Sequence, residues 1–303
     1  MRGKAATSIA FVVLATLAAR ALAQAPAVVV QRGIVYGKGG DVELALDLAG
    51  PADEKGPFPA LVFVHGGGWR AGDRSMFFPE ILRAAERGYV AATVSYRLTS
   101  VEDAGKPRYP WPAQIEDVKC AVRWLRANAS LWRIDPERIG AMGGSAGGHL
   151  VLLLGMADSS AGLEGSGGNA GESSRVQAVV NFFGPTELVR CHETSPGGAP
   201  LAEKLLGGTP REVPGSYRDA SPVTYASADD PPALTMHGDR DAIVPIEQAK
   251  ILDERLKAAG VRHDLAVFAG EGHGWQGAEL ERSVALMYDF FDRHLKGGAG
   301  SGK

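Results

Sequence analysis

The sequence is poor in three features that would each indicate a particular class of protein: cysteine, clustered positive charge and long apolar segments. Its 303 residues include 2 cysteines, Cys120 and Cys191, and neither has the spacing of a metal site. Acidic and basic residues are interspersed, and the net charge is -3. Binding to a phosphate backbone requires concentrated positive charge, so we do not expect nucleic acid as a partner.

An apolar run at the N-terminus, residues 9–19, follows Arg2 and Lys4 and precedes the small-x-small sequence Ala21-Leu22-Ala23. This order is typical of a secretory signal peptide. A membrane anchor is the alternative, but the run is short for a bilayer and Arg20 interrupts it. We therefore expect residues 1–23 to be removed on export to the periplasm or the medium, leaving no membrane span. Their removal takes away three basic residues and no acidic one, so the net charge of -3 becomes -6.

Export would place the two cysteines where a disulfide can persist. Cys120 lies in a helical pattern whose apolar face is formed by Ile115, Val118, Val122 and Leu125. At about 100° per residue, Cys120 points away from that face, toward any loop that covers the helix. The loop that holds Cys191 is one candidate. A Cys120–Cys191 bridge and two independent thiols both remain open.

The chain contains 40 glycines and 18 prolines, which indicates many tight turns. Residues 28–36 and 42–47 are predicted to be the first strands. From residue 60 onward, short continuous apolar runs alternate with helical patterns, as in a parallel sheet that is covered on both faces. The predicted strands are residues 61–64, 90–94, 139–142, 176–183, 233–236 and 265–268. The predicted helices are residues 78–87, 113–128, 146–156, 246–259 and 280–295.

This alternation predicts one α/β domain over residues 24–296, with a mostly parallel sheet of about eight strands and helices on both faces. The glycine-rich residues 297–303 are expected to be a disordered tail. Two segments interrupt the alternation: residues 158–174, rich in Gly and Ser, and residues 184–227. Long insertions of this kind overhang the strand ends where ligands bind, and we expect residues 184–227 to cover the site.

A candidate nucleophile is Ser145, in the sequence Gly143-Gly144-Ser145-Ala146-Gly147-Gly148. It falls between a predicted strand and a predicted helix, which is the context of a nucleophile elbow. The positive end of the following helix would favour a developing oxyanion. A glycine-rich turn without a catalytic role is the alternative. A second glycine-rich turn, residues 65–69 (HGGGW), follows the strand at 61–64 and exposes backbone N–H groups.

His273 is the preferred base among the seven histidines, because it follows the strand at 265–268 and precedes the last helix. His65 is expected to brace the glycine turn instead. The acid should follow the strand at 233–236, where both Asp239 and Asp241 are available. We favour Asp241, because the apolar residues after it would shelter the carboxylate from water.

Four segments carry a resemblance to a known family. They are residues 65–69 (HGGGW), 143–148 (GGSAGG), 237–241 (HGDRD) and 272–274 (GHG). Together and in this order, they resemble the motifs of the α/β-hydrolase carboxylesterases. The likeness is greatest to the bacterial esterase/lipase group related to hormone-sensitive lipase and to feruloyl and acetylxylan esterases. The resemblance implies the α/β-hydrolase fold, Ser145 as nucleophile, His273 as base and Asp241 as acid. It implies that the N–H groups of Gly67, Gly68 and Ala146 form an oxyanion hole. Two departures are Gly144, where hormone-sensitive-lipase relatives usually have Asp, and an N-terminus of strands instead of a helical cap.

We therefore expect an exported serine carboxylesterase that uses no metal and no organic cofactor. Its expected substrates are small-molecule or polysaccharide-linked esters with short acyl or plant-polymer side-chain groups, such as acetyl or feruloyl. Trp69, Trp275, Tyr217 and Tyr225 are candidates to line an aromatic or sugar site, although packing is an equally common role. The alternatives are a prolyl oligopeptidase-like peptidase, an arylformamidase-like amidase and a catalytically inactive hydrolase-fold binding module.

Overall fold

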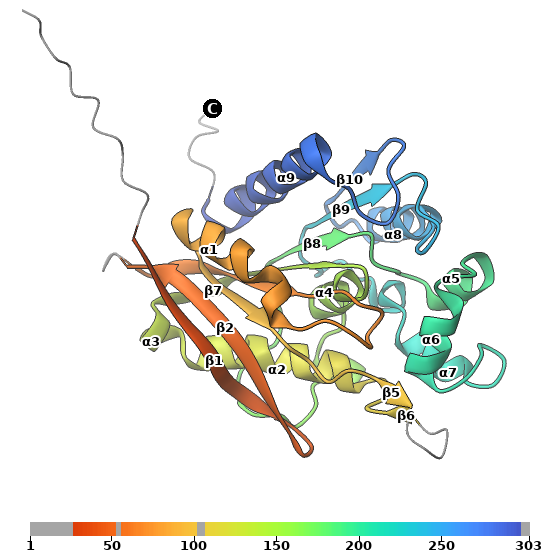
Figure 1. Ribbon diagram of the computed structural model, residues 1–303, viewed down its shortest axis with the longest axis horizontal. Coiled ribbons are helices and arrows are strands. Elements are labelled where there is room, and N and C mark those ends of the chain that lie inside the picture. The colour runs from red at the N-terminus through yellow and green to blue at the C-terminus, as the bar shows by residue number, and fades with distance from the viewer. Residues whose placement is uncertain (1–26, 53–55, 102–106, 298–303) are drawn as a thin grey trace, which may run out of the picture.

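The computed structural model describes residues 27–52, 56–101 and 107–297. Eight strands form one sheet in the order β1-β2-β4-β3-β7-β8-β9-β10 (Figure 1). β1 pairs antiparallel with β2, and β2 with β4, whereas all other neighbours are parallel. The predicted mostly parallel sheet of about eight strands is confirmed. The strands are β1 (Val28–Gly39), β2 (Val42–Pro51), β3 (Phe58–Val64), β4 (Val90–Val94), β7 (Ile134–Gly144), β8 (Ala178–Phe182), β9 (Ala233–Gly238) and β10 (His263–Phe268).

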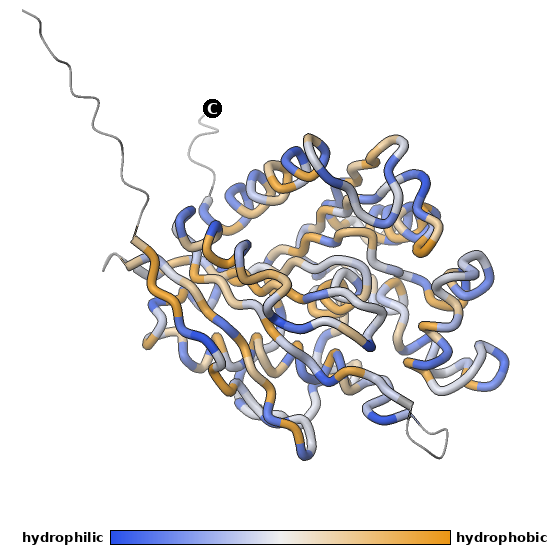
Figure 2. Tube along the Cα trace, viewed as in Figure 1, coloured by the Kyte–Doolittle hydropathy of each residue, from blue (hydrophilic) through white to orange (hydrophobic). Residues whose placement is uncertain are grey.

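Helices cover both faces of the sheet and divide the core into two clusters. On one face, α1 (Phe78–Glu86) and α9 (Gly277–Leu295) bury Ile81 and Phe291 among their apolar residues. On the other, α2 (Ala113–Ala127), α4 (Ala146–Met156) and α8 (Glu247–Ala258) bury their own set. Figure 2 shows α9 alternating between hydrophobic and hydrophilic residues, as expected of a helix with one solvent face.

The central elements are buried on all sides, which explains their unbroken apolar sequences. Every residue of β4, β8 and α4 is buried. A strand between two helical layers has no solvent face, so it shows no alternation of polar and apolar residues. Among the described residues, no helix combines the length and apolarity that crossing a bilayer requires.

The segment 184–227, which we expected to cover the site, consists largely of short helices. These are α5 (Leu188–Thr194), α6 (Ala199–Leu206), α7 (Pro214–Asp219) and a 3-10 turn at Pro222–Tyr225. In Figure 1 they form a group at the edge of the molecule next to the end of β8. The remaining short elements are α3 (Ala129–Trp132), β5 (Ser100–Val101), β6 (Pro107–Arg108) and 3-10 turns at Arg74–Phe77 and Ser159–Ala161.

The two cysteines are unpaired and buried in different places. Cys120 on α2 does face a covering loop, but that loop belongs to residues 158–174 and not to the segment that holds Cys191. Its Sγ lies 3.8 Å from the carbonyl oxygen of Tyr36, and a side chain at Gly167 would collide with it. The Cys120 thiol therefore fills space in the core. The predicted signal peptide, residues 1–23, and residues 298–303 of the predicted tail lie outside the described residues.

Candidate active site

Ser145 occupies a strained turn between β7 and α4. Its backbone has φ 56° and ψ -121°, a left-handed conformation that L-residues rarely adopt. The N–H of Ser145 donates to the carbonyl oxygen of Phe182 at 2.8 Å, which fixes the turn to β8. A side chain at Gly147 would place its Cβ 2.0 Å from the carbonyl oxygen of Val64. The glycine in the elbow sequence is therefore required by the close approach of β3.

The structure brings Ser145, His273 and Asp241 into one hydrogen-bonded line. His273 Nε2 lies 2.8 Å from Ser145 Oγ, and His273 Nδ1 lies 2.7 Å from Asp241 Oδ2. Asp241 follows β9, and His273 lies between β10 and α9. The three side chains thus come from the carboxyl ends of three strands, where the parallel sheet places its ligand-binding edge.

Asp241, and not Asp239, is the carboxylate beside His273. The Asp241 side chain is fully buried, and its Oδ1 accepts hydrogen bonds from the N–H groups of Ile243 and Val244, both at 2.8 Å. Burial acts to raise the pKa of Asp241, but hydrogen bonds from His237, His273 and the Val244 amide outweigh it and hold this pKa well below its usual range. Asp239 instead accepts a hydrogen bond from the Gly270 N–H at 2.7 Å, at the surface.

His237 is a fourth member of this cluster that the sequence analysis did not assign. Its Nε2 lies 2.7 Å from the carbonyl oxygen of Val244 and 3.4 Å from Asp241 Oδ2. The carbonyl can only accept, so Nε2 carries the hydrogen and also points toward the carboxylate. His237 therefore holds the turn that presents Asp241. The four-residue spacing of the two side chains in the HGDRD segment was the available sequence signal.

The two predicted glycine-rich segments supply backbone N–H groups near Ser145. No hydrogen bond within the described residues uses the N–H of Gly67, Gly68 or Ala146. Gly68 and Ala146 line the same small cavity as Ser145, whereas Gly67 precedes it in the turn. Gly67 has φ 110°, and a Cβ there would lie 2.2 Å from the carbonyl oxygen of Ala71. The turn thus requires glycine, and it leaves donors for an anion beside Ser145.

Two histidines, His65 and His149, hold the glycine turn in place through ring and hydrogen-bond contacts. The ring of His65 stacks on Tyr96 at 4.3 Å, and Tyr96 Oη donates to the His65 carbonyl oxygen at 3.0 Å. Trp69 Nε1 donates to His149 Nδ1 at 3.3 Å, while His149 Nε2 donates to the carbonyl oxygen of Ala220 at 2.7 Å. Burial lowers the pKa of His149 to about 4, so the ring stays neutral. The turn, α4 and residues 184–227 are thereby joined through His149.

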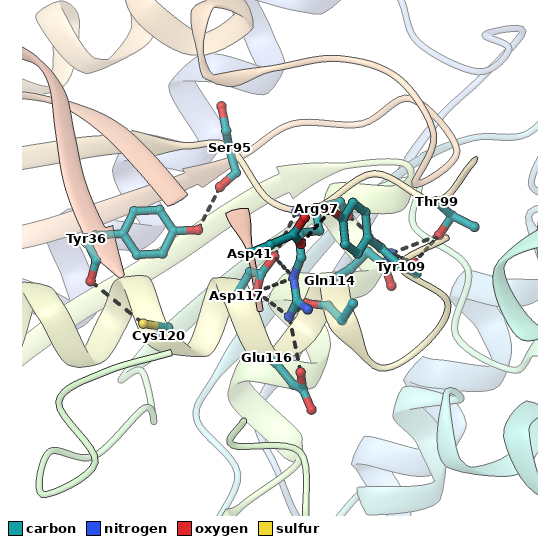
Figure 3. Close-up of polar contacts among 11 residues, drawn as sticks. Tyr36, Asp41, Ser95, Arg97, Thr99, Tyr109, Gln114, Glu116, Asp117 and Cys120 are labelled. Carbon is teal, nitrogen blue, oxygen red and sulfur yellow. Dashed lines mark hydrogen bonds and ion pairs between the residues drawn. The ribbon is translucent and has the colours of Figure 1, made fainter. Parts of the chain in front are cut away.

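The loop after β4 forms a second brace, shown in Figure 3. The guanidinium of Arg97 makes a forked contact with the carboxylate of Asp117 on α2, at distances of 2.7–3.0 Å. In the same loop, the N–H of Thr99 donates to the carbonyl oxygen of Trp69 at 2.8 Å. Gln114 on α2 binds the Thr99 hydroxyl at 2.9 Å. The ion pair therefore fixes the loop on which the glycine turn rests.

The small cavity beside Ser145 has a volume of about 20 Å³ and almost entirely apolar walls. Trp69 and Cys191 contribute to it, together with Leu188 and Leu201 from the covering helices. Trp275 lines a second cavity, which extends to Gly144 and Gly274. Neither cavity is lined by Tyr217 or Tyr225, whose hydroxyls donate to the carbonyl oxygens of Gly208 and Asp219. These two tyrosines pack within residues 184–227.

In the part of the chain that the structure describes, no group of three or more His, Cys, Asp or Glu side chains is arranged to share a metal ion. His263 contacts Asp253 and Thr235, both at 2.9 Å.

Comparisons with known proteins identify the family. The BD-FAE family model matches residues 46–256. The probable carboxylic ester hydrolase LipM of Mycobacterium tuberculosis is 36% identical over 215 residues, 70% of this chain and 46% of LipM. Esterase LipC of the same organism is 34% identical over 226 residues, 72% of this chain and 53% of LipC. The chain thus spans about half the length of these curated relatives.

Solved structures resemble the chain over nearly its whole length. A truncated carbohydrate esterase from gut microbiota has a TM-score of 0.77 at 29% identity, and the match covers 90% of this chain and 98% of that one. The thermophilic esterase Est2 of Thermogutta terrifontis has a TM-score of 0.73 at 29% identity, with coverage of 92% and 95%. The chain therefore belongs to the BD-FAE family, among the α/β-hydrolase carboxylesterases.

Proposed function

We propose that the protein is an exported serine carboxylesterase that removes short acyl groups, acetyl to butyryl, from small molecules or from plant-polymer side chains. The observation that carries the proposal is the hydrogen-bonded line Ser145–His273–Asp241 at the strained turn, beside unused backbone donors. Nucleophile, base, orienting carboxylate and anion site lie within contact of one another, as ester hydrolysis through an acyl-enzyme requires.

In the acylation step, Ser145 Oγ attacks the ester carbonyl carbon while its proton moves to His273 Nε2. The carbonyl π pair becomes the oxyanion, which accepts hydrogen bonds from the N–H groups of Gly68 and Ala146, with Gly67 completing the set. Asp241 stays ionised, holds the ring tautomer and stabilises the imidazolium. Each oxyanion donor of this kind lowers the barrier by about 3 kcal/mol.

Collapse of the tetrahedral intermediate breaks the bond to the alcohol oxygen, which takes the proton from His273 Nε2. The acyl group is then bound to Ser145 Oγ. A water molecule attacks this ester, giving one proton to His273, and the second collapse returns the proton to Ser145 and releases the carboxylic acid. The cycle needs only side chains and backbone of this chain.

The small cavity supports the short end of the acyl range. Its volume of about 20 Å³ is close to that of one water-sized probe. Leu188, Cys191 and Leu201 limit it, and a longer acyl chain has no enclosed wall to bury against there. Of the two side chains expected from plant polymers, acetyl fits this cavity better than feruloyl. The carbohydrate esterase among the structural neighbours is consistent with a sugar-linked ester.

The test is Ser145→Ala, assayed on p-nitrophenyl acetate and acetylated xylan. We expect at least a thousand-fold loss of kcat with an unchanged melting temperature, and labelling of Ser145 by an organophosphate in the wild-type protein. Ser160→Ala, at an exposed serine, is the matched control and should keep full activity. Recovery of the label on another serine, or substantial activity in Ser145→Ala, would reject Ser145 as the nucleophile.

The test of export is separate. The full-length chain expressed in a bacterium should appear in the periplasm or medium with Gln24 as its first residue. Retention of residues 1–23 in a membrane fraction would support the anchor instead. Peptide p-nitroanilides, run beside the esters, test the peptidase alternative, and faster cleavage of these amides than of acetate esters would favour it.

A further inference from the structure

A second cavity, of about 190 Å³, extends to Gly144 and Gly274, next to the site of Ser145 and His273. It lies beside the carboxyl ends of β7 and β8 and is flanked by residues of α1 and α9. Its walls are mostly apolar and aromatic, including Phe77, Phe182 and Trp275. Gly144 and Gly274 are the neighbours of Ser145 and His273 in the sequence, and they line the cavity at the end nearest to these two residues.

Gly144 lines the cavity directly beside the nucleophile in the sequence. A Cβ at this position would lie 3.5 Å from the Phe183 ring, which also lines the cavity. The glycine has no positive φ, so the turn does not require it. The backbone at this position would accept a side chain, and because glycine has none, this end of the cavity stays open. This is the position at which the sequence departs from the hormone-sensitive-lipase pattern.

The cavity lies on the His273 side of the nucleophile. Phe183, which lines it, packs its ring 4.7 Å from the His273 ring and 5.3 Å from the Trp275 ring. Phe183 itself has φ 42°, a strained conformation that sets the ring in this place. In the proposed mechanism, His273 protonates the departing alcohol oxygen. The alcohol half of the ester must therefore lie on this side, and the acyl half must lie in the small cavity.

Two polar side chains that line the cavity have buried atoms without a hydrogen-bond partner among the described residues. Tyr288 is 1% exposed, and its hydroxyl has no hydrogen-bond partner among the described residues. One carboxylate oxygen of Glu80 is also buried without a partner there, while its other oxygen lies 3.8 Å from the Arg83 guanidinium. Both residues line the cavity. Buried polar atoms are rarely left unpaired, so a ligand that supplies a hydroxyl would satisfy these atoms.

We propose that this cavity binds the alcohol portion of the ester when that portion is a hydroxylated aromatic ring. The proposal rests on the proposed function, because it assigns the cavity to the same Ser145 site. Aromatic walls favour a planar ring through stacked and edge contacts. An apolar cavity of roughly 150 Å³ is known to hold benzene, so 190 Å³ has room for a ring and its hydroxyl. The ring hydroxyl donates to Glu80 and accepts from Tyr288.

Binding is measured first without catalysis, in the Ser145→Ala protein. The probe is 4-hydroxybenzyl alcohol, followed by titration calorimetry and by Trp275 fluorescence. We expect saturable binding that Tyr288→Phe weakens about 5-fold, with no such change for benzyl alcohol. Val284→Phe fills the cavity from α9 and should abolish binding, whereas Leu286→Phe, on the same helix outside the cavity, should not. Equal affinities for the probe in all these proteins would overturn the proposal.

Kinetics on the wild-type nucleophile provide the second measurement. Val284→Phe should reduce kcat/KM for 4-hydroxybenzyl acetate about 10-fold and leave ethyl acetate within 2-fold, because only the ring enters the cavity. If this variant does not fold, Leu280→Trp, at an exposed position of α9 that lines the same cavity, narrows it in the same assay. Equal losses on both esters would overturn the assignment. Probe binding without any ester hydrolysis would instead reject the proposed function and retain the cavity as a ring-binding site.

Discussion

At the scale of single residues, the elbow depends on positions that tolerate no side chain. We predict that Gly147→Ala destabilises the fold by about 3 kcal/mol or more, because its Cβ would lie 2.0 Å from the Val64 carbonyl oxygen and backbone has to move. The measurement is the melting temperature. Gly215→Ala is the control, since a Cβ there meets nothing within 4 Å. Equal melting temperatures for the two variants would contradict the packing argument.

Substitutions of the two aspartates after β9 test which carboxylate orients the His273 ring. Asp241→Asn should reduce kcat by about 10⁴, because an amide at this position favours the wrong tautomer of His273. Asp239→Asn, which changes only the surface contact with Gly270, should stay within a few-fold of wild type. The assay is p-nitrophenyl acetate hydrolysis at saturating substrate. A larger effect at Asp239 would mean that the carboxylate which orients the base is misassigned.

At the scale of elements, the central strands and helices were predictable, because double-sided burial produces unbroken apolar runs. The order strand, Ser145, helix was equally plain from the sequence. Short elements were not predictable. The helices of residues 184–227 span only six to eight residues and are separated by Gly and Pro, so their periodicity is too brief to recognise. The sequence predicted that Cys120 faces a covering loop, but it did not identify residues 158–174 as that loop, because only the folded chain brings them onto α2.

The cavities were outside the reach of sequence reasoning for a different reason. The second cavity is lined by residues from α1, β7, β8 and α9, between positions 77 and 288, and only the packed sheet brings them together. The sequence shows that Gly144 departs from the hormone-sensitive-lipase pattern, but the effect of this glycine depends on the position of the Phe183 ring. The roles of Tyr96 and Arg97 likewise depend on tertiary contacts with the glycine turn.

In the proposed function the covering helices limit the length of the acyl group, and a substitution in α6 tests this role. Leu201→Ala should enlarge the small cavity and move the preferred p-nitrophenyl ester from acetate toward butyrate or hexanoate. Each added methylene that becomes buried gains about 0.8 kcal/mol, or roughly 4-fold in kcat/KM. Leu206→Ala, on the same helix and outside the cavity, controls for general loosening. An unchanged chain-length profile in a folded Leu201→Ala protein would show that α6 does not limit the acyl group.

At the scale of the whole molecule, buried histidines make stability depend on pH. His149 has its pKa lowered from 6.5 to about 4, chiefly by burial, and burial also lowers the pKa values of His65 and His263. A histidine with a depressed pKa binds fewer protons when folded than when unfolded. The stability that the neutral His149 ring contributes to the folded protein is therefore fully present above pH 6.5 and is lost as the pH falls from 6.5 toward 4.

We predict that acidification from pH 7.5 to pH 5 costs about 2 kcal/mol through His149 alone. Denaturant unfolding at the two pH values measures this loss. His149→Gln, whose amide can still donate to Ala220, should be less stable at pH 7.5 and show a smaller pH dependence. Wild-type and variant curves with the same pH dependence would mean that His149 protonates as readily in the folded chain as in the unfolded one.

The origin of the Ser145–His273–Asp241 line also affects how the chain acquires activity as it folds. The contact of Ser145 with His273 spans 128 positions, and it exists only when β9 and β10 have joined the sheet beside β8. Local helices form early, whereas contacts of such sequence separation form late. During refolding, helical circular dichroism should therefore return before ester hydrolysis. The return of enzyme activity then measures the rate at which the β9–β10 edge docks onto the sheet.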